Sequence, residues 1–125
     1  MQYDADKNPD PGAWLELDEQ ERIELVIDFH RRTGVQLEKP EPHAIAHVAV
    51  ENQVALGEAT SVPRTLCRLM DEGLDRHDAV HAIGSTLMEV MFATVHGPDD
   101  GGDVTAEYNR KLAALTAAGW RSQLK

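Results

Sequence analysis

Apolar side chains recur three or four residues apart in five stretches of this 125-residue chain, and no stretch shows the alternation of a half-buried strand. Spacing of this kind gives each stretch one apolar face when it coils into a helix, so the faces must pack against one another. Residues that begin or end helices stand between the stretches, at Pro42, Gly57, Pro63 and Gly73. The sequence therefore predicts an all-α fold, a compact four- or five-helix bundle that forms a single domain over residues 1–125.

The predicted helices begin at residues that suit helix starts. Asp18 or Leu17 opens the first helix, and Asp75 caps the fourth. The predicted spans run from about residue 18 to Arg32, from Pro42 to about Leu56, from Ser61 to Gly73, from Asp75 to about Val95, and from about Val104 to near Gly119. Residues 1–15 are predicted to be an extended lead-in that Trp14 holds against the body, and residues 96–103 an acidic loop rich in Gly and Asp.

The composition argues against several classes of partner. The formal net charge of -10 disfavours binding to nucleic acid or to an anionic membrane surface, because both need clustered Lys and Arg side chains. No apolar run approaches the roughly 20 residues that span a bilayer, and the first residues lack the pattern of a signal peptide. The one cysteine, Cys67, permits no intramolecular disulfide and suits a reducing compartment. We expect a cytoplasmic protein that binds neither nucleic acid nor membrane.

Two His-x-x-x-His pairs, His43 with His47 and His77 with His81, are the most specific chemical feature. Residues four apart lie about one turn along the same helix face, so each pair can aim two imidazoles in one direction. The pairs fall in the second and fourth predicted helices, and if these helices are neighbours the four rings can meet. Neutral imidazole is a common ligand of zinc, iron, copper and nickel. The spacing therefore predicts a site for one transition-metal ion, with zinc or iron favoured.

Other polar residues near these pairs have less specific roles. Glu51 lies one turn beyond His47, where it would be a fifth ligand, a group that orients a ligand, or a general base. Glu89, further along the fourth predicted helix, would lie at the rim of the site. His30 falls on the core-facing stripe of the first helix and His96 at the end of the fourth, and neither position requires a metal.

Two other interpretations stay open. A metal-free module for protein interaction or homo-oligomerisation would use the apolar face of the fourth predicted helix, with Met88, Met91 and Phe92, or the terminal region around Trp120, although helix-spaced apolar residues more often belong to a core. The dipeptide His77-Asp78 is similar to the His-Asp doublet of helical metal-dependent phosphohydrolases, which would need two metals. Spacing alone does not choose between a structural and a catalytic site, so enzyme activity is left open.

Three segments share a recognisable pattern of polar and apolar residues. They are Trp14-Leu-Glu-Leu-Asp-Glu-Gln-Glu-Arg-Ile23, His43-Ala-Ile-Ala-His47-Val-Ala-Val-Glu51-Asn-Gln53 and Gly73-Leu-Asp-Arg-His77-Asp-Ala-Val-His81-Ala-Ile83. The pattern resembles a family of small bacterial helical domains of unknown function, some of which accompany an SEC-C metal-binding motif. The resemblance covers about residues 11–95. It implies a polar signature of His43, His47, Glu51, Gln53, His77 and His81, and it implies no activity, substrate or partner.

Overall fold

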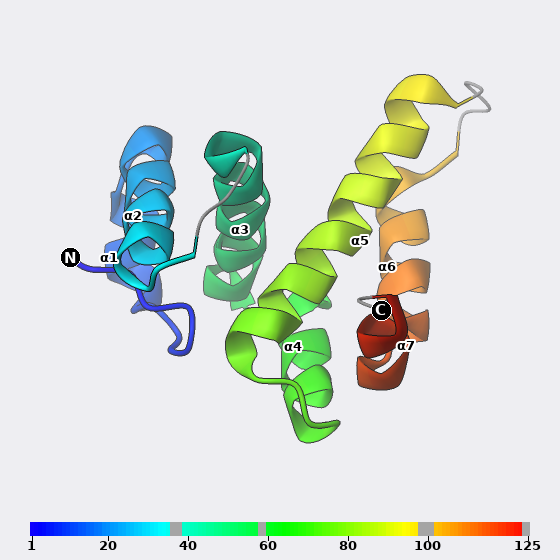
Figure 1. Ribbon diagram of the computed structural model, residues 1–125. Helices are drawn as coiled ribbons and strands as arrows, with labels where there is room; N and C mark the ends of the chain where they lie inside the picture. The colour runs from blue at the N-terminus through cyan, green and yellow to red at the C-terminus, as the bar shows by residue number, and fades with distance from the viewer. Residues whose placement is uncertain (36–38, 58–59, 98–101, 124–125) are drawn as a thin grey trace.

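The computed structural model describes residues 1–35, 39–57, 60–97 and 102–123. Within these ranges the chain forms seven α-helices and no strand, which confirms the all-α class (Figure 1). The helices are α1 Pro11–Glu16, α2 Glu19–Arg32, α3 Pro40–Ala55, α4 Val62–Asp71, α5 Arg76–His96, α6 Val104–Ala114 and α7 Ala117–Gln123. The predicted count of four or five is too low, because the two short helices α1 and α7 were not predicted.

The longer helices begin where local hydrogen bonds favour a start. Asp18 caps α2 by accepting a hydrogen bond of 2.8 Å from the backbone N–H of Glu21, and the Glu21 carboxylate accepts one from the N–H of Asp18. Asp75 caps α5 in the same way, accepting from the backbone N–H of Asp78 at 2.8 Å. Each cap joins residues three positions apart in the chain, so both caps can be predicted from the sequence.

The lead-in predicted for residues 1–15 is non-helical only as far as Asp10. The side chain of Asp10 accepts a hydrogen bond from the first turn of α1, and Pro11 occupies the first helical position, where its missing N–H costs little. Trp14 is fully buried, as expected of a residue that holds this segment against the body. Its ring centroid lies 5.7 Å from that of Tyr3.

The last predicted helix is broken into two. It was expected to end near Gly119, but α6 ends at Ala114 and α7 begins at Ala117, with Leu115 in an extended conformation between them. Of the acidic loop predicted for residues 96–103, residues 98–101 lie outside the described part of the chain.

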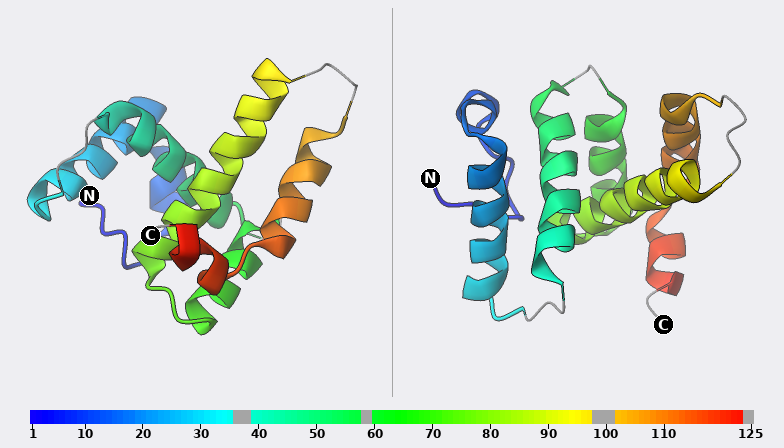
Figure 2. Two further views of the ribbon diagram at one scale, coloured as in Figure 1. Left: turned by 45° about the vertical axis from the view of Figure 1, so that its right-hand side comes forward. Right: turned by 90° about the horizontal axis from the view of Figure 1, so that it is seen from above.

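The helices form a row in which each packs on its neighbours (Figures 1 and 2). Helices α1 and α2 lie on one side of α3, and α4 and α5 lie on the other, with α6 beyond α5. Gly84 of α5 faces Ala46 and Val50 of α3, whose side-chain atoms stand 3.7 Å from the place of a Cβ on Gly84. Small residues thus bring α3 and α5 together, and the two helices that carry the histidine pairs are neighbours.

The core has two parts, and α3 contributes to both. One part surrounds Trp14, Val26 and Phe29 and includes Val48 of α3. The other includes Val50 of α3 and extends over α4, α5 and α6. Burial on both sides fixes α3 between α2 and α5, which positions the histidines. None of the helices in the described ranges has the length and apolar character needed to cross a membrane.

Candidate metal centre

Five of the six histidines meet where α2, α3 and α5 come together. His30 comes from α2, His43 and His47 from α3, and His77 and His81 from α5. The ring centroids of His43 and His81 are 4.6 Å apart, and those of His77 and His81 are 4.2 Å apart. The centroids of His30 and His47 are 5.0 Å apart. The two pairs therefore point at one place, as their spacing predicts, and His30 joins them.

Four of these rings place their nitrogens at distances suited to one ion. One ring nitrogen from each of His30, His47, His77 and His81 lies within 4.8 Å of the others. The Nε2 atom of His30 is 3.3 Å from Nε2 of His77 and 3.2 Å from Nε2 of His43. A tetrahedral shell with metal–nitrogen bonds of about 2.0–2.1 Å has edges of about 3.3 Å. The separation between His30 and His77 matches such an edge, all separations in the group of four lie within 4.8 Å, and His43 stands outside that group.

His30 is the residue that sequence reasoning left outside the site. Its place on a core-facing stripe is confirmed, because the side chain is 2% exposed. That stripe, however, faces the other histidines. The Nδ1 atom of His30 lies 2.9 Å from the carbonyl oxygen of Val26, and a carbonyl can only accept, so Nδ1 carries the proton and donates. In the neutral ring, Nε2 then presents its lone pair to the other histidines.

His47 has its tautomer set by Tyr3. The Tyr3 hydroxyl donates its one proton to Oε2 of Glu51. Its oxygen lies 3.2 Å from Nδ1 of His47 and therefore accepts a hydrogen bond from the Nδ1–H group. The lone pair of His47 is thus on Nε2, which is buried and has no hydrogen-bond partner among the described residues. Nε2 of His81 is also buried and unpaired within that part of the chain.

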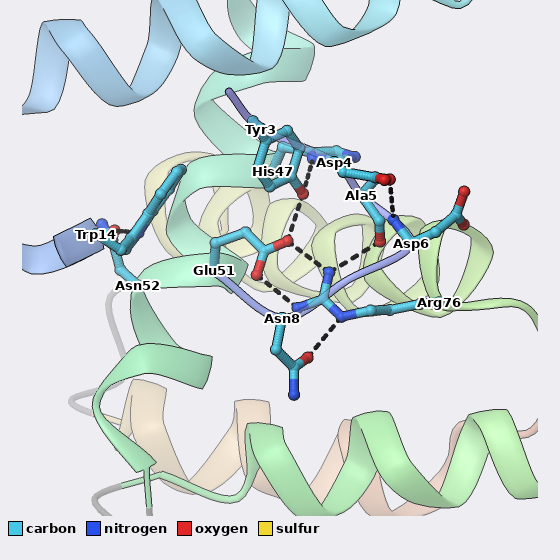
Figure 3. A network of polar contacts seen from close by, with 10 residues as sticks. All are labelled: Tyr3, Asp4, Ala5, Asp6, Asn8, Trp14, His47, Glu51, Asn52 and Arg76. Carbon is cyan, nitrogen blue, oxygen red and sulfur yellow. Dashed lines mark hydrogen bonds and ion pairs between the residues drawn. The ribbon is translucent and has the colours of Figure 1, made fainter. Parts of the chain in front are cut away.

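Glu51 orients the cluster instead of joining it (Figure 3). Its two carboxylate oxygens accept hydrogen bonds of 2.8 Å from the two terminal nitrogens of Arg76, and Oε2 also accepts the Tyr3 hydroxyl. Glu51 is 1% exposed and Arg76 is 3% exposed, so this is a buried ion pair. Of the three roles considered for Glu51, these contacts favour that of an orienting group, because both oxygens are engaged and, in the described part of the chain, the group with ligand atoms close enough to share one ion consists of four histidines.

The N-terminal segment completes this network, and sequence reasoning did not identify it. Arg76 donates to the carbonyl oxygen of Ala5 at 2.9 Å and to the side-chain oxygen of Asn8 at 2.7 Å. Arg32 of α2 donates to the carbonyl oxygen of Tyr3 at 2.8 Å. Residues 3–8 therefore lie across α3 and α5 and bring the Tyr3 hydroxyl to the histidines (Figure 3). The segment has no helical spacing that would have indicated this.

Four of the clustered histidines, His43, His47, His77 and His81, are held in the neutral form that binds metals. Burial, with a smaller contribution from neighbouring histidines, lowers the pKa of His43 to about 4 and that of His81 to about 3. Burial also lowers the pKa values of His47 and His77 from the ordinary histidine value. These four side chains are therefore uncharged at pH 7 and offer lone pairs.

Three other residues considered in the sequence lie elsewhere. Asp78 is exposed and outside the group of four, so the group lacks the carboxylate of a His-Asp phosphohydrolase doublet. Glu89 is exposed and pairs with Lys111 instead of lying at the rim. His96 ends α5, exposed, with its ring 4.3 Å from that of Phe92. The candidate donor set in the described chain is therefore made of histidine nitrogens.

Comparison of the chain with protein-family models, with curated proteins and with solved structures found no match.

Proposed function

We propose that this chain binds one transition-metal ion at the junction of α2, α3 and α5, with His30, His47, His77 and His81 as ligands. The observation that carries the proposal is the pair of buried Nε2 atoms on His47 and His81 that have no partner among the described residues. His47 and His81 belong to the group of four histidines that each offer one nitrogen within 4.8 Å of the others. A buried polar atom without a partner costs about 1–3 kcal/mol, and a bound cation would remove that cost for both.

The donor set indicates the class of ion. Neutral imidazole nitrogens suit zinc, iron, copper and nickel, whereas magnesium and calcium prefer oxygen ligands. Zinc and iron(II) are the ions that we propose. His43, whose Nε2 atom lies 3.2 Å from that of His30, stands outside this group of four, so the proposed site keeps a fifth coordination position open beside it. The same chemistry would extend to the family of small bacterial helical domains that the sequence resembles.

The proposal is tested by the metal content of untagged protein, measured by elemental mass spectrometry after purification without chelator or a nickel column. We expect about one zinc or iron per chain, since the group of four surrounds one position. The double variant His47→Ala/His81→Ala should retain no metal, and His30→Ala should retain less than the wild type. His96→Ala is the matched control, because it removes an exposed histidine outside the cluster. Unchanged stoichiometry in the double variant would contradict the assignment.

A second candidate function is protein interaction or homo-oligomerisation without metal. It is supported by the apolar side chains near the C-terminal end of α5, where Met91 is 46%, Phe92 67% and Val95 70% exposed. A melting temperature that chelators do not change, together with assembly that depends on protein concentration, would favour this function over metal binding.

A further inference from the structure

A cavity of about 580 Å³ lies beside the histidines, between α3, α5 and α7. Its volume is in the range of about 300–1,000 Å³ that is usual for small-molecule sites. Six of its lining residues are apolar in character: Pro42, Ala46, Val80, Gly84, Met88 and Trp120. The others are His43, His47, His81 and Ser85, so none of the lining residues carries a fixed charge.

The cavity connects the surface to the proposed metal site. Pro42, Ser85 and Met88 line it and are exposed, whereas His47, which also lines it, is 2% exposed. His81, a proposed ligand, also forms part of its wall. A molecule that enters from the surface would therefore contact the rings of two proposed ligands, His47 and His81.

Trp120, which lines the cavity, has an indole N–H group without a hydrogen-bond partner among the described residues. Its Nε1 atom is buried and unpaired within the described ranges. The other tryptophan of the chain, Trp14, donates from Nε1 to the side-chain oxygen of Asn52 at 2.9 Å. A buried indole N–H usually finds an acceptor. A polar atom of a bound molecule would be an acceptor that the described residues do not supply.

We propose that this cavity binds a small, uncharged and largely apolar molecule whose nitrogen or oxygen donor coordinates the ion held by the histidines. The inference rests on the proposed metal site and adds the class of its ligand. Apolar walls favour an apolar body, and no Lys or Arg is among the lining residues, so the charged oxygens of a phosphate group that do not coordinate the ion would lie unpaired against these walls. Phosphate esters are therefore excluded from the proposed ligand class.

The test uses zinc-loaded, nitrogen-15-labelled protein and 4-phenylimidazole as the probe. The two tryptophans give two indole N–H signals, which the variant Trp120→Phe assigns. We expect the signal of Trp120 to shift with saturation as the probe is added, while that of Trp14 stays in place. Inorganic phosphate should move neither signal. The probe should bind metal-free protein at least tenfold more weakly, because coordination is lost.

Two matched variants locate the binding site on α5. Ser85→Phe places a large ring at the exposed end of the cavity and should weaken probe binding at least tenfold. Ala93→Phe places the same ring on an exposed position of the same helix outside the cavity and should leave binding unchanged.

The outcomes separate this inference from the proposed function. Zinc bound at one per chain with no selective shift of the Trp120 signal overturns the inference alone. Equal affinity of the probe for zinc-loaded and metal-free protein also overturns it, as does phosphate binding at the same place. Protein that takes up neither zinc nor iron(II) refutes the metal site itself, and the inference with it.

Discussion

Replacing Tyr3 with phenylalanine would remove the one oxygen atom that joins His47 to Glu51. The change keeps the aromatic ring, whose centroid lies 5.6 Å from that of Phe29 and 5.7 Å from that of Trp14. It leaves the Nδ1–H group of His47 buried without its acceptor and removes one of the hydrogen bonds to the Glu51 carboxylate. The variant therefore tests whether Tyr3 orients a metal ligand.

The expected magnitude follows from these contacts. Loss of a group that orients a metal-binding histidine typically lowers metal affinity by about 10–100-fold, or about 1.4–2.7 kcal/mol. A buried donor without a partner costs about 1–3 kcal/mol of folding stability. We expect the zinc dissociation constant of Tyr3→Phe to rise by about 10–100-fold, measured by competition with a chromophoric chelator.

The matched control is Tyr108→Phe, which changes the only other tyrosine in the same way. The Tyr108 hydroxyl is also part of a hydrogen bond, which it donates to the Gln53 side chain at 2.8 Å, away from the histidines. Both variants should lose stability in urea unfolding, but only Tyr3→Phe should lose zinc affinity. An affinity of Tyr3→Phe within about twofold of the wild type, or an equal fall in Tyr108→Phe, would refute the reasoning.

Two further predictions concern stability. Burial lowers the pKa values of His47 and His81 in the folded state below the ordinary 6.5, so the unfolded chain binds protons that the folded chain does not. Metal-free protein should keep this contribution above pH 6.5 and lose it as the pH falls, by about 1.4 kcal/mol for each histidine at pH 5.5. Urea unfolding with chelator present measures this, and equal stability at pH 7.5 and 5.5 would contradict it. Arg76→Met should cost about 3–5 kcal/mol because it leaves Glu51 charged and buried, whereas Glu51→Met/Arg76→Met should cost less than that single variant. Additive losses in thermal or urea unfolding would show that the pair does not act as a unit.

The parts of the site that depend on local spacing were predictable. His43 with His47 and His77 with His81 share helix faces because they are four residues apart, and the pairs do meet between α3 and α5. His30 could have been found from one signal, a polar side chain on a stripe that is otherwise core-facing. Whether His30 joined the site depended on which helices that stripe would pack against. The spacing of residues within α2 does not specify those helices.

The sequence by itself determined where the main helices form and which way each histidine pair points, because caps and helix faces depend on residues three or four positions apart. Only the tertiary structure decided that His30 joins the cluster and that Glu51 is joined to it through Tyr3. Tyr3 lies 44 residues from His47, and Arg76 lies 25 from Glu51. Contacts over such separations form only when helix packing buries polar groups together, and each buried group must then find a partner.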